Sequence, residues 1–259
     1  MRLVSERGLR VVAVTDHDSL EGLDEARREV ALHPGMTLIP GIELGTDTAD
    51  GEIHLLGYYL DGNDPELQET LARFRDGRKL RARRMVEKLQ GMGFQIEWDR
   101  VAELAKGAIA RPHIAQAMVE KGYVAYPYQA FDRYIGRNGP AYVERDKLTP
   151  EDAVRLVARH GGVPAIAHPA EIPHLEVIVE SLVAQGLAGL EVHYGVYTNE
   201  QVERLLGLCS QWGLIPLGGS DYHASGNPEE AQPGSVGPPM ESAERLMSLA
   251  GTERPASTS

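Results

Sequence analysis

Cysteine is nearly absent from this chain, because Cys209 is the single example in 259 residues. One cysteine cannot form an internal disulfide, so we expect a protein of a reducing compartment, with the cytoplasm as the default location. Long apolar runs are missing too. No stretch approaches the roughly 18 residues of a membrane span, and no apolar signal-peptide core follows Met1. The sequence therefore excludes a disulfide-rich secreted domain and predicts no membrane partner.

Positive charge is also scarce, because 26 Lys and Arg residues oppose 38 Asp and Glu residues and give a formal charge of −12 at pH 7. This balance argues against a protein that coats long duplex nucleic acid by electrostatics. Short nucleotides remain possible ligands, since bound metal ions and a local basic patch can outweigh the global charge. The length of 259 residues suits one large α/β domain with an insertion.

Several apolar runs carry a histidine or a carboxylate at or near one end. The runs and their polar residues are 11–14 with Thr15-Asp16-His17-Asp18, 38–42 with Glu43, 53–59 with His54, 163–167 with His168-Pro169, and 214–219 with Ser220-Asp221-Tyr222-His223. Side chains at the same end of successive parallel strands converge on one face of a barrel, where such folds carry out their chemistry. The pattern therefore predicts a site built from residues that are distant in the sequence.

Strand and helix patterns alternate in two parts of the chain, which predicts a parallel sheet with helical crossovers. We expect strands at 9–14, 36–42, 53–59, 163–167, 187–192 and 214–217, and helices at 19–32, 149–160, 174–184, 199–211 and 240–249. Residues 64–145 have a mainly helical pattern, which we interpret as an insertion placed like a lid beside the site. The expected division is therefore a barrel at 1–63 and 146–250, a helical insertion at 64–145, and a disordered tail at 251–259.

Six residues are candidate metal ligands: His17, Glu43, His54, His168, Asp221 and His223. Imidazole and carboxylate together suit divalent ions such as Mn, Fe and Zn. Two or three such ions would polarise a phosphoryl group and activate a water molecule. His33, His160 and His174 are expected at the surface or at helix ends instead, and His193, which follows a strand, is a candidate catalytic proton donor. Asp16 and Asp18 either orient His17 or cap its turn.

A basic segment stands out in this acidic chain: Arg73, Arg75, Arg78, Lys79, Arg81, Arg83 and Arg84 lie close together. One interpretation is a solvated helix face paired with nearby acids. The other is that Arg78 or Lys79 helps to bind a substrate phosphate. Arg111 precedes Pro112 at a predicted helix start, where the guanidinium and the helix N-terminus both favour phosphate. Arg111 is therefore the first candidate for a phosphate contact, and His113 is the second.

Four of these segments together resemble the polymerase and histidinol phosphatase (PHP) superfamily of metal-dependent phosphoesterases: Thr15-Asp16-His17-Asp18, Gly41-Ile42-Glu43, Ala167-His168-Pro169 and Gly219-Ser220-Asp221-Tyr222-His223. Residues 110–115 and 131–143 narrow the resemblance to the branch that hydrolyses nucleoside 3′,5′-bisphosphates and trims the 5′ ends of short RNAs. The resemblance implies a distorted seven-stranded (β/α)7 TIM-like barrel with a helical insertion. It also implies up to three ions, with Glu43 bridging, His54 and His168 at one ion, Asp221 at another, and His223 with His17 at a third.

The sequence departs from the family pattern at its start. Family members begin with a strand that carries a His-x-His pair, whereas no histidine precedes His17 here. We therefore expect the first strand and three ligands to be missing from the sequence as given, through a late start assignment, a truncation or degeneration. On that expectation the chain binds metal weakly and has little activity.

The leading functional hypothesis is hydrolysis of a small nucleotide phosphate, or removal of the 5′ end of a short RNA. The alternatives are a phosphatase for another small ester such as histidinol phosphate, and a non-catalytic module that binds nucleotide.

Overall fold

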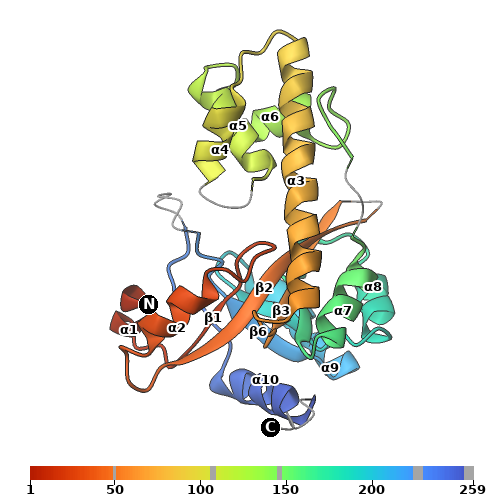
Figure 1. The fold of residues 1–259 in the computed structure, drawn as a ribbon. Helices are drawn as coiled ribbons and strands as arrows, with labels where there is room; N and C mark the ends of the chain where they lie inside the picture. Colours follow the sequence, from red (N-terminus) through yellow and green to blue (C-terminus); the bar gives the residue numbers. More distant parts are fainter. Residues whose placement is uncertain (49–50, 106–108, 145–147, 224–229, 254–259) are drawn as a thin grey trace. The chain divides into compact units, whose positions relative to one another are not determined.

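A computed structural model describes residues 1–48, 51–105, 109–144, 148–223 and 230–253 (Figure 1). The chain divides into two compact units. The first, here called the sheet unit, comprises Met1–Asp64 and Leu148–Ser259. The second, here called the helical unit, comprises Pro65–Lys147.

The sheet unit is built on a curled sheet of six strands, which lie side by side in the order of the sequence. The strands are β1 (Val11–Val14), β2 (Thr37–Asp47), β3 (Glu52–Tyr58), β4 (Val163–Ile166), β5 (Gly189–Tyr194) and β6 (Ile215–Gly219). The expected β/α alternation is confirmed at its C-terminal end, where β4, β5 and β6 are parallel neighbours with helices between them. The fold is therefore of the mixed α/β class.

Strand β3 corrects the expectation of a parallel arrangement, because it runs antiparallel to both β2 and β4. Only a short connection separates the end of β2 at Asp47 from the start of β3 at Glu52. A parallel neighbour needs a crossover of a dozen or more residues, whereas a short connection can only return the chain as a hairpin. The hairpin places Glu43 opposite Leu56 and His54 opposite Gly45.

The helices of the sheet unit are α1 (Arg2–Glu6), α2 (Leu23–Val30), α7 (Pro150–Arg159), α8 (Leu175–Val183), α9 (Asn199–Trp212) and α10 (Met240–Glu253), with a 3-10 turn, η2, at Pro169–Glu171. Helices α2, α7, α9 and α10 pack against the strands, and α8 packs against α7 and α9. The helix expected from residue 149 is confirmed as α7, and the hydroxyl of Thr149 caps it by accepting the Asp152 N–H at 3.1 Å. The predicted start of α2 at Ser19 is wrong, because the Ser19 hydroxyl accepts the Glu21 N–H in a turn and the helix begins at Leu23.

Helix α10 packs on the inner face of the curled sheet. Its Leu246 and Ala250 join a buried cluster with Ile39, Leu56, Tyr58, Val163, Ala165, Ala167, Ile215 and Leu217. Alternate residues of a strand share a face, so Glu43 lies on the same face of β2 as Ile39, and His54 on the same face of β3 as Leu56. The sheet pattern that buries this core therefore also directs two candidate ligands to the inner face. Helix α10 ends at Glu253, beyond the end expected at residue 249; residues 254–259 of the expected tail lie outside the described residues.

The helical unit is formed by α3 (Pro65–Gly91), α4 (Trp98–Ala105), α5 (Arg111–Glu120), α6 (Pro127–Ala130) and a π-helical turn, η1 (Phe131–Ile135). Its core is apolar and includes Met85, Leu89, Val101, Ile114, Met118 and Ile135, each at most 1% exposed. No helix within the described residues is long and apolar enough to cross a membrane.

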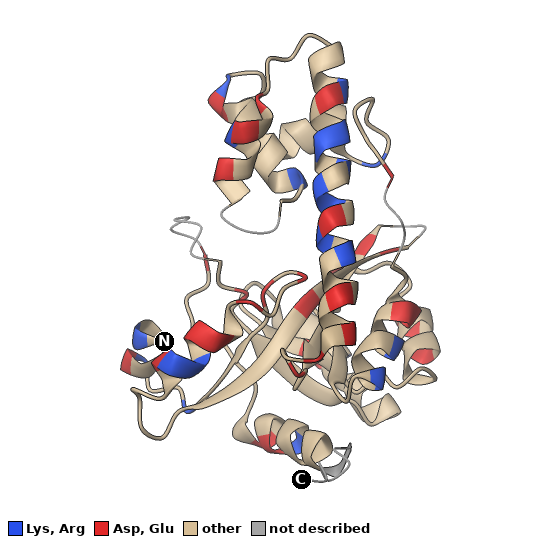
Figure 2. Cartoon of the chain, in the orientation of Figure 1, with Lys and Arg blue, Asp and Glu red and all other residues tan. Residues whose placement is uncertain are grey.

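Charge is divided unevenly between the two units. The helical unit carries 16 Lys and Arg residues and 11 Asp and Glu residues, a formal charge of +5, which leaves −17 for the sheet unit. Figure 2 shows Lys and Arg recurring along α3. Part of the basic segment has a structural role, since the nearly buried Arg81 donates from Nε to the Val143 carbonyl at 2.8 Å and lies over the Tyr142 ring.

Candidate metal centre

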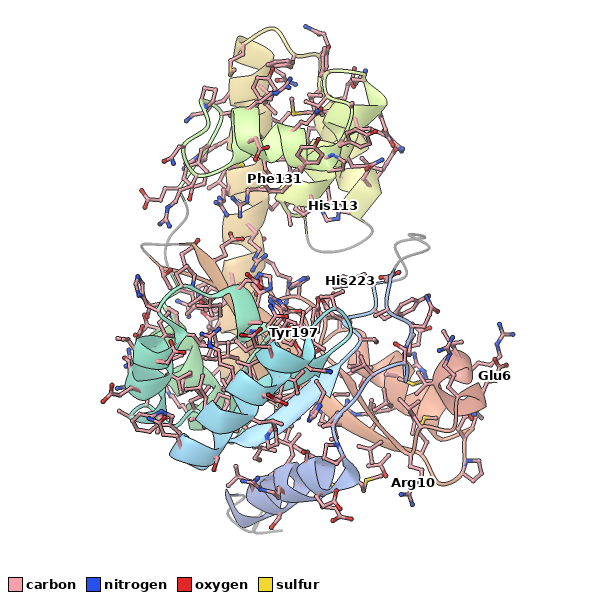
Figure 3. The ribbon with its side chains drawn as sticks, turned by 180° about the vertical axis from the view of Figure 1, so that it is seen from behind. Glu6, Arg10, His113, Phe131, Tyr197 and His223 are labelled. Atoms are coloured by element: carbon pink, nitrogen blue, oxygen red, sulfur yellow. The ribbon has the colours of Figure 1, made fainter. Side chains whose placement is uncertain are left out.

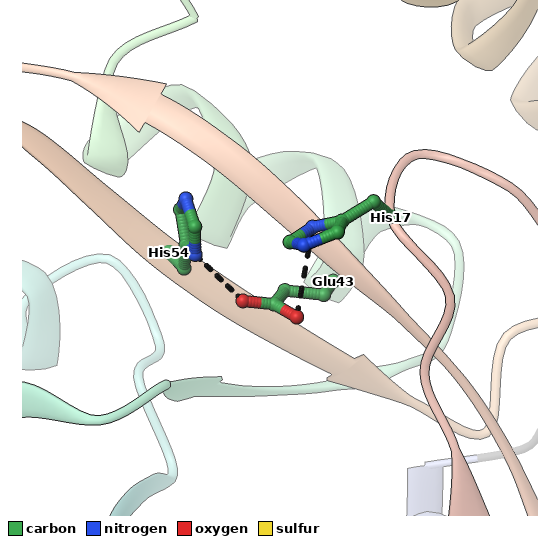
Figure 4. A group of neighbouring side chains, drawn as sticks. All are labelled: His17, Glu43 and His54. Carbon is green, nitrogen blue, oxygen red and sulfur yellow. Dashed lines mark ion pairs between the residues drawn. The ribbon is translucent and has the colours of Figure 1, made fainter. Parts of the chain in front are cut away.

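Glu43 is the centre of a cluster of polar side chains on the inner face of the sheet unit (Figure 4). Its side chain is almost fully buried. The Nδ1 atom of His54 lies 2.7 Å from Oε1 of Glu43, and Nδ1 of His17 lies 3.6 Å from Oε2. One carboxylate therefore has an imidazole at each of its two oxygens.

His168 adds a third imidazole to this cluster. Its Nε2 atom lies 3.3 Å from Oε1 of Glu43 and 3.1 Å from Nδ1 of His54. The rings of His54 and His168 meet edge to face with centroids 5.0 Å apart. Residues from β2, from β3 and from the turn after β4 thus meet at one carboxylate oxygen.

Asp221 and His223 extend the cluster from the segment after β6. Tyr194 of β5 donates its hydroxyl to Oδ2 of Asp221 at 3.0 Å, and its ring centroid lies 6.0 Å from that of His168. The ring of His223 lies 5.6 Å from that of His17, and its Nδ1 is 2.8 Å from the Asp221 carbonyl. The six candidate ligands therefore form one connected group, with Glu43 and three histidines at its centre.

Backbone geometry explains how residues after the strand ends enter this group. The Asp18 N–H donates to the Glu43 carbonyl at 2.9 Å, and the Glu43 N–H donates to the Asp16 carbonyl at 3.1 Å, so the turn after β1 is tied beside β2. Asp18, His168 and Asp221 have positive φ values of 50°, 31° and 49°. A left-handed conformation at a non-glycine residue is uncommon and tends to occur at functional sites, where surrounding contacts hold it.

Glu43 and His168 shift each other's pKa toward the charged form. Burial alone would raise the pKa of Glu43, but hydrogen bonds with His168 and His54 and the nearby His17 outweigh that effect and hold the pKa well below its usual value. Burial lowers the pKa of His168, yet the hydrogen bond with Glu43 and the neighbouring negative charges raise it overall. Burial, with added repulsion from Asp221 and Glu43, raises the pKa of Glu191 to about 7.

The donor set fits a divalent transition metal. The ligand atoms of His17, Glu43 and His54 all lie within 4.8 Å of one another. Ligands of a tetrahedral Zn²⁺ site lie about 2.1 Å from the ion, and therefore about 3.4 Å from each other. The spacings of 2.7–3.6 Å around Glu43 bracket that value. Mixed imidazole and carboxylate ligands suit Zn, Mn and Fe.

The remaining predicted site residues lie elsewhere. His193 is in β5, and no hydrogen bond or ion pair of the described residues joins its side chain to the cluster; the β5–β6 register shifts between Glu191 and His193. Four others belong to the helical unit. Arg78 and Lys79 lie in α3, Arg111 is the first residue of α5, and the guanidinium carbon of Arg111 lies 5.5 Å from the Phe131 ring centroid. Figure 3 shows His113 and Phe131 at one end of this unit.

Sequence reasoning missed two β5 residues that touch the cluster, Glu191 and Tyr194. Glu191 accepts the His168 N–H at Oε2, at 2.8 Å. The signal for Glu191 was present, because an acid within the otherwise apolar stretch 189–192 is unusual in a buried strand. Tyr194 gave no comparable signal, since an aromatic residue is ordinary in a strand.

No family model matches the chain. Individual known proteins do match it, and those described below are named as enzymes that act on phosphate esters. The chain is 31% identical over 221 residues to a 5′-3′ exoribonuclease of Haemophilus influenzae, covering 84% of this chain and 80% of that protein. It is 30% identical over 226 residues to a 3′,5′-nucleoside bisphosphate phosphatase of Chromobacterium violaceum, covering 85% and 79%. It is also similar to a solved structure of a metal-dependent phosphoesterase from Bifidobacterium adolescentis, with a TM-score of 0.79, 30% identity, and coverage of 96% and 90%.

The pairing of Glu43 with His168 can be tested in metal-free protein by a Glu43→Gln variant. Without the carboxylate charge, burial opposes only the charges of Glu191 and Asp221, so the pKa of His168 should fall from its raised value. Folding of the parent chain raises this pKa, so protonated His168 stabilises the fold fully below pH 6.5, and the stabilisation is lost as the pH rises through the folded value.

NMR titration of the imidazole signals measures the shift in that pKa. The control is Glu97→Gln, which removes a carboxylate paired with Lys121 in the helical unit and should leave the titration of His168 unchanged. An unchanged pKa in Glu43→Gln would mean that the two side chains are not coupled.

Proposed function

The chain belongs to the PHP superfamily of metal-dependent phosphoesterases, and we propose that it hydrolyses nucleoside 3′,5′-bisphosphates to nucleoside 5′-monophosphates and phosphate. It is a hydrolase of phosphoric esters. The observation that carries the proposal is the buried carboxylate of Glu43 with the imidazoles of His17, His54 and His168 around it. Such a set of donors is suited to holding divalent cations beside a phosphate ester.

We assign the metal-ligand roles to the six clustered residues. Glu43 would bridge ions, His54 and His168 would bind one ion, Asp221 a second, and His17 with His223 a third. Two or three ions of Mn, Fe or Zn are proposed. When bound, such ions polarise the phosphoryl group and make a water molecule more acidic.

Protein groups around the ligands orient them before any substrate arrives. The hydroxyl of Tyr194 donates to Oδ2 of Asp221 and so fixes that oxygen. The other oxygen, Oδ1, lies 3.5 Å from Nδ1 of His223. His193 stays the predicted proton donor to the leaving group. Because burial lowers the pKa of His193, its protonated form, and with it this role, requires a lower pH than for an ordinary histidine.

We propose that Arg111 and His113 bind a phosphate of the substrate, with Arg78 and Lys79 as further cationic contacts. Arg111 and His113 lie in the first turn of α5, whose N–H groups and dipole favour anions. Nδ1 of His113 accepts the Ala110 N–H at 3.0 Å. Burial lowers the pKa of His113, so the ring is neutral and carries its proton on Nε2, as a donor.

Short single-stranded RNA is the second proposed substrate, and features of the helical unit favour it. The unit has a formal charge of +5 in an acidic chain. It also exposes the rings of Tyr126 and Tyr128, which are 58% and 59% exposed and stack nearly parallel with centroids 5.8 Å apart. Exposed aromatic rings beside positive charge are a common means of binding nucleobases without sequence preference.

Replacement of His168 by alanine tests the link between the cluster and hydrolysis. With Mn²⁺ in excess, we expect phosphate release from adenosine 3′,5′-bisphosphate to fall at least about hundredfold, because one imidazole ligand is lost. The matched control is His33→Ala, which removes a partly exposed histidine outside the cluster and should leave release unchanged.

Circular dichroism checks that both variants fold. Faster release from histidinol phosphate than from the bisphosphate by the parent chain would favour the alternative ester. Nucleotide binding without release from either ester would favour a non-catalytic module.

Replacement of Arg111 by alanine tests recognition of the second phosphate. The KM for the 3′,5′-bisphosphate should rise by about tenfold or more, because a charge-assisted hydrogen bond contributes about 1.5–3 kcal/mol. The KM for a nucleoside 3′-monophosphate should change little. Steady-state kinetics measure both, with Arg100→Ala as the control, since Arg100 pairs with Glu103 and Glu120 in the same unit. Equal increases for the two substrates would contradict this role.

A double replacement of Tyr126 and Tyr128 by alanine tests the RNA proposal. Loss of base stacking should lower kcat/KM for a short 5′-phosphorylated oligoribonucleotide by about tenfold, since stacking contributes about 1–3 kcal/mol per base. The same variant should hydrolyse the mononucleotide bisphosphate normally. The corresponding double phenylalanine variant keeps both rings and should keep the RNA activity. Full RNA activity in the alanine variant would remove this support.

A further inference from the structure

The turn that follows β4 is held by hydrogen bonds from three directions. The Ala167 N–H donates to the His54 carbonyl of β3 at 2.9 Å. The His168 N–H donates to the Glu191 carboxylate at 2.8 Å, and the Ala170 N–H donates to the hydroxyl of Tyr197 at 3.0 Å. Tyr197 lies in the segment between β5 and α9 (Figure 3). The backbone around His168 is therefore fixed by groups outside its own segment.

Glu191 takes the place of a backbone acceptor at the point where strand pairing stops. The paired residues of β4 and β5 end at Ile166 and Leu190. Beyond that point the His168 backbone turns into the left-handed region, with φ 31° and ψ 56°, and leaves the strand direction. The carboxylate of Glu191, one residue past Leu190, reaches across to the His168 N–H. The Glu191 side chain thus extends the hydrogen bonding between β4 and β5 by one further contact.

Burial makes this contact significant. Glu191 is 7% exposed, and a buried carboxylate is costly unless hydrogen bonds satisfy it. A left-handed conformation at a non-glycine residue is also unfavourable and persists where its surroundings hold it. One hydrogen bond offsets both costs. The His168 N–H satisfies the buried Glu191 carboxylate, and the carboxylate holds His168 in its left-handed conformation.

We propose that Glu191 is a positioning residue, which fixes the turn at His168 and so holds the His168 imidazole against Glu43. The acceptor oxygen of Glu191, rather than its negative charge, performs this role. The inference deepens the proposed function and rests on it wherever metal binding is concerned. The backbone contact itself does not depend on metal.

Two substitutions separate the acceptor from the charge. Glu191→Gln keeps an acceptor oxygen of nearly the same shape, whereas Glu191→Ala removes the acceptor. In metal-free protein, amide hydrogen exchange followed by NMR should show the His168 N–H losing protection at least about tenfold in Glu191→Ala. Protection should be nearly unchanged in Glu191→Gln. Equal loss in both variants, or no loss in either, would overturn the proposal.

A Mn²⁺ titration followed by electron paramagnetic resonance provides the second readout. Supporting groups behind metal ligands contribute about 10–100-fold in metal affinity, so Glu191→Ala should weaken binding by that amount and Glu191→Gln by less than about threefold. The double variant Glu191→Ala/His168→Ala should bind no more weakly than His168→Ala alone, because Glu191 acts through His168. A fully additive double variant would instead assign Glu191 its own contact with the ion and overturn the proposal.

A control variant separates positioning from general stability. Thr149→Ala removes the cap of α7 and should lower the stability of the sheet unit without affecting either readout. A comparable loss of Mn²⁺ affinity in Thr149→Ala would overturn the proposal, since destabilisation alone would then explain the effect. A parent chain that binds no Mn²⁺ would defeat the proposed function, while the exchange experiment would still decide the role of Glu191.

Discussion

The arrangement of the sheet unit depends on one buried carboxylate that is stabilised by imidazoles. Glu43 is 4% exposed, and an isolated carboxylate at such a position would be strongly destabilising. Hydrogen bonds with His54 and His168 and the charge of His17 overcome that cost and keep the acid ionised. The three histidines come from the turn after β1, from β3 and from the turn after β4. Any change that separates these segments leaves a buried charge without compensation, so the sheet and the cluster are mutually dependent.

The same interactions organise the site for cations. Glu43, Asp221 and Glu191 bring three acids close to one another, and the repulsion of Glu191 by the other two contributes to its raised pKa. A divalent ion would relieve this repulsion and replace the protons on the histidines. The surrounding hydrogen bonds, from Tyr194 to Asp221 and from the His168 N–H to Glu191, orient these groups in advance. The sheet unit thus holds a preformed set of donors.

Much of this organisation follows from the sequence, and the exceptions have physical causes. The six ligand candidates could be identified because each lies at or near the end of an apolar run, and the ends of neighbouring strands meet at one edge of a sheet. The parallel direction expected for β3 was wrong, because the short connection after Asp47 outweighs the βα pattern around it. The helix expected from Ser19 begins later, at Leu23, because the Ser19 hydroxyl accepts the Glu21 N–H in a turn. Glu191 and Tyr194 were missed because their roles depend on contacts with residues far away in the sequence, which periodicity does not encode.

The hairpin of β2 and β3 has a consequence for how the cluster is assembled during folding. Glu43 and His54 lie on one continuous hairpin, so closing the loop between them costs little chain entropy. His168 and Asp221 must join from more than a hundred residues further along the chain, after the whole helical unit. Contacts that are local in sequence form sooner than distant ones. We therefore expect Glu43 and His54 to come together early in folding, and the later strands to add His168 and Asp221 to this pair.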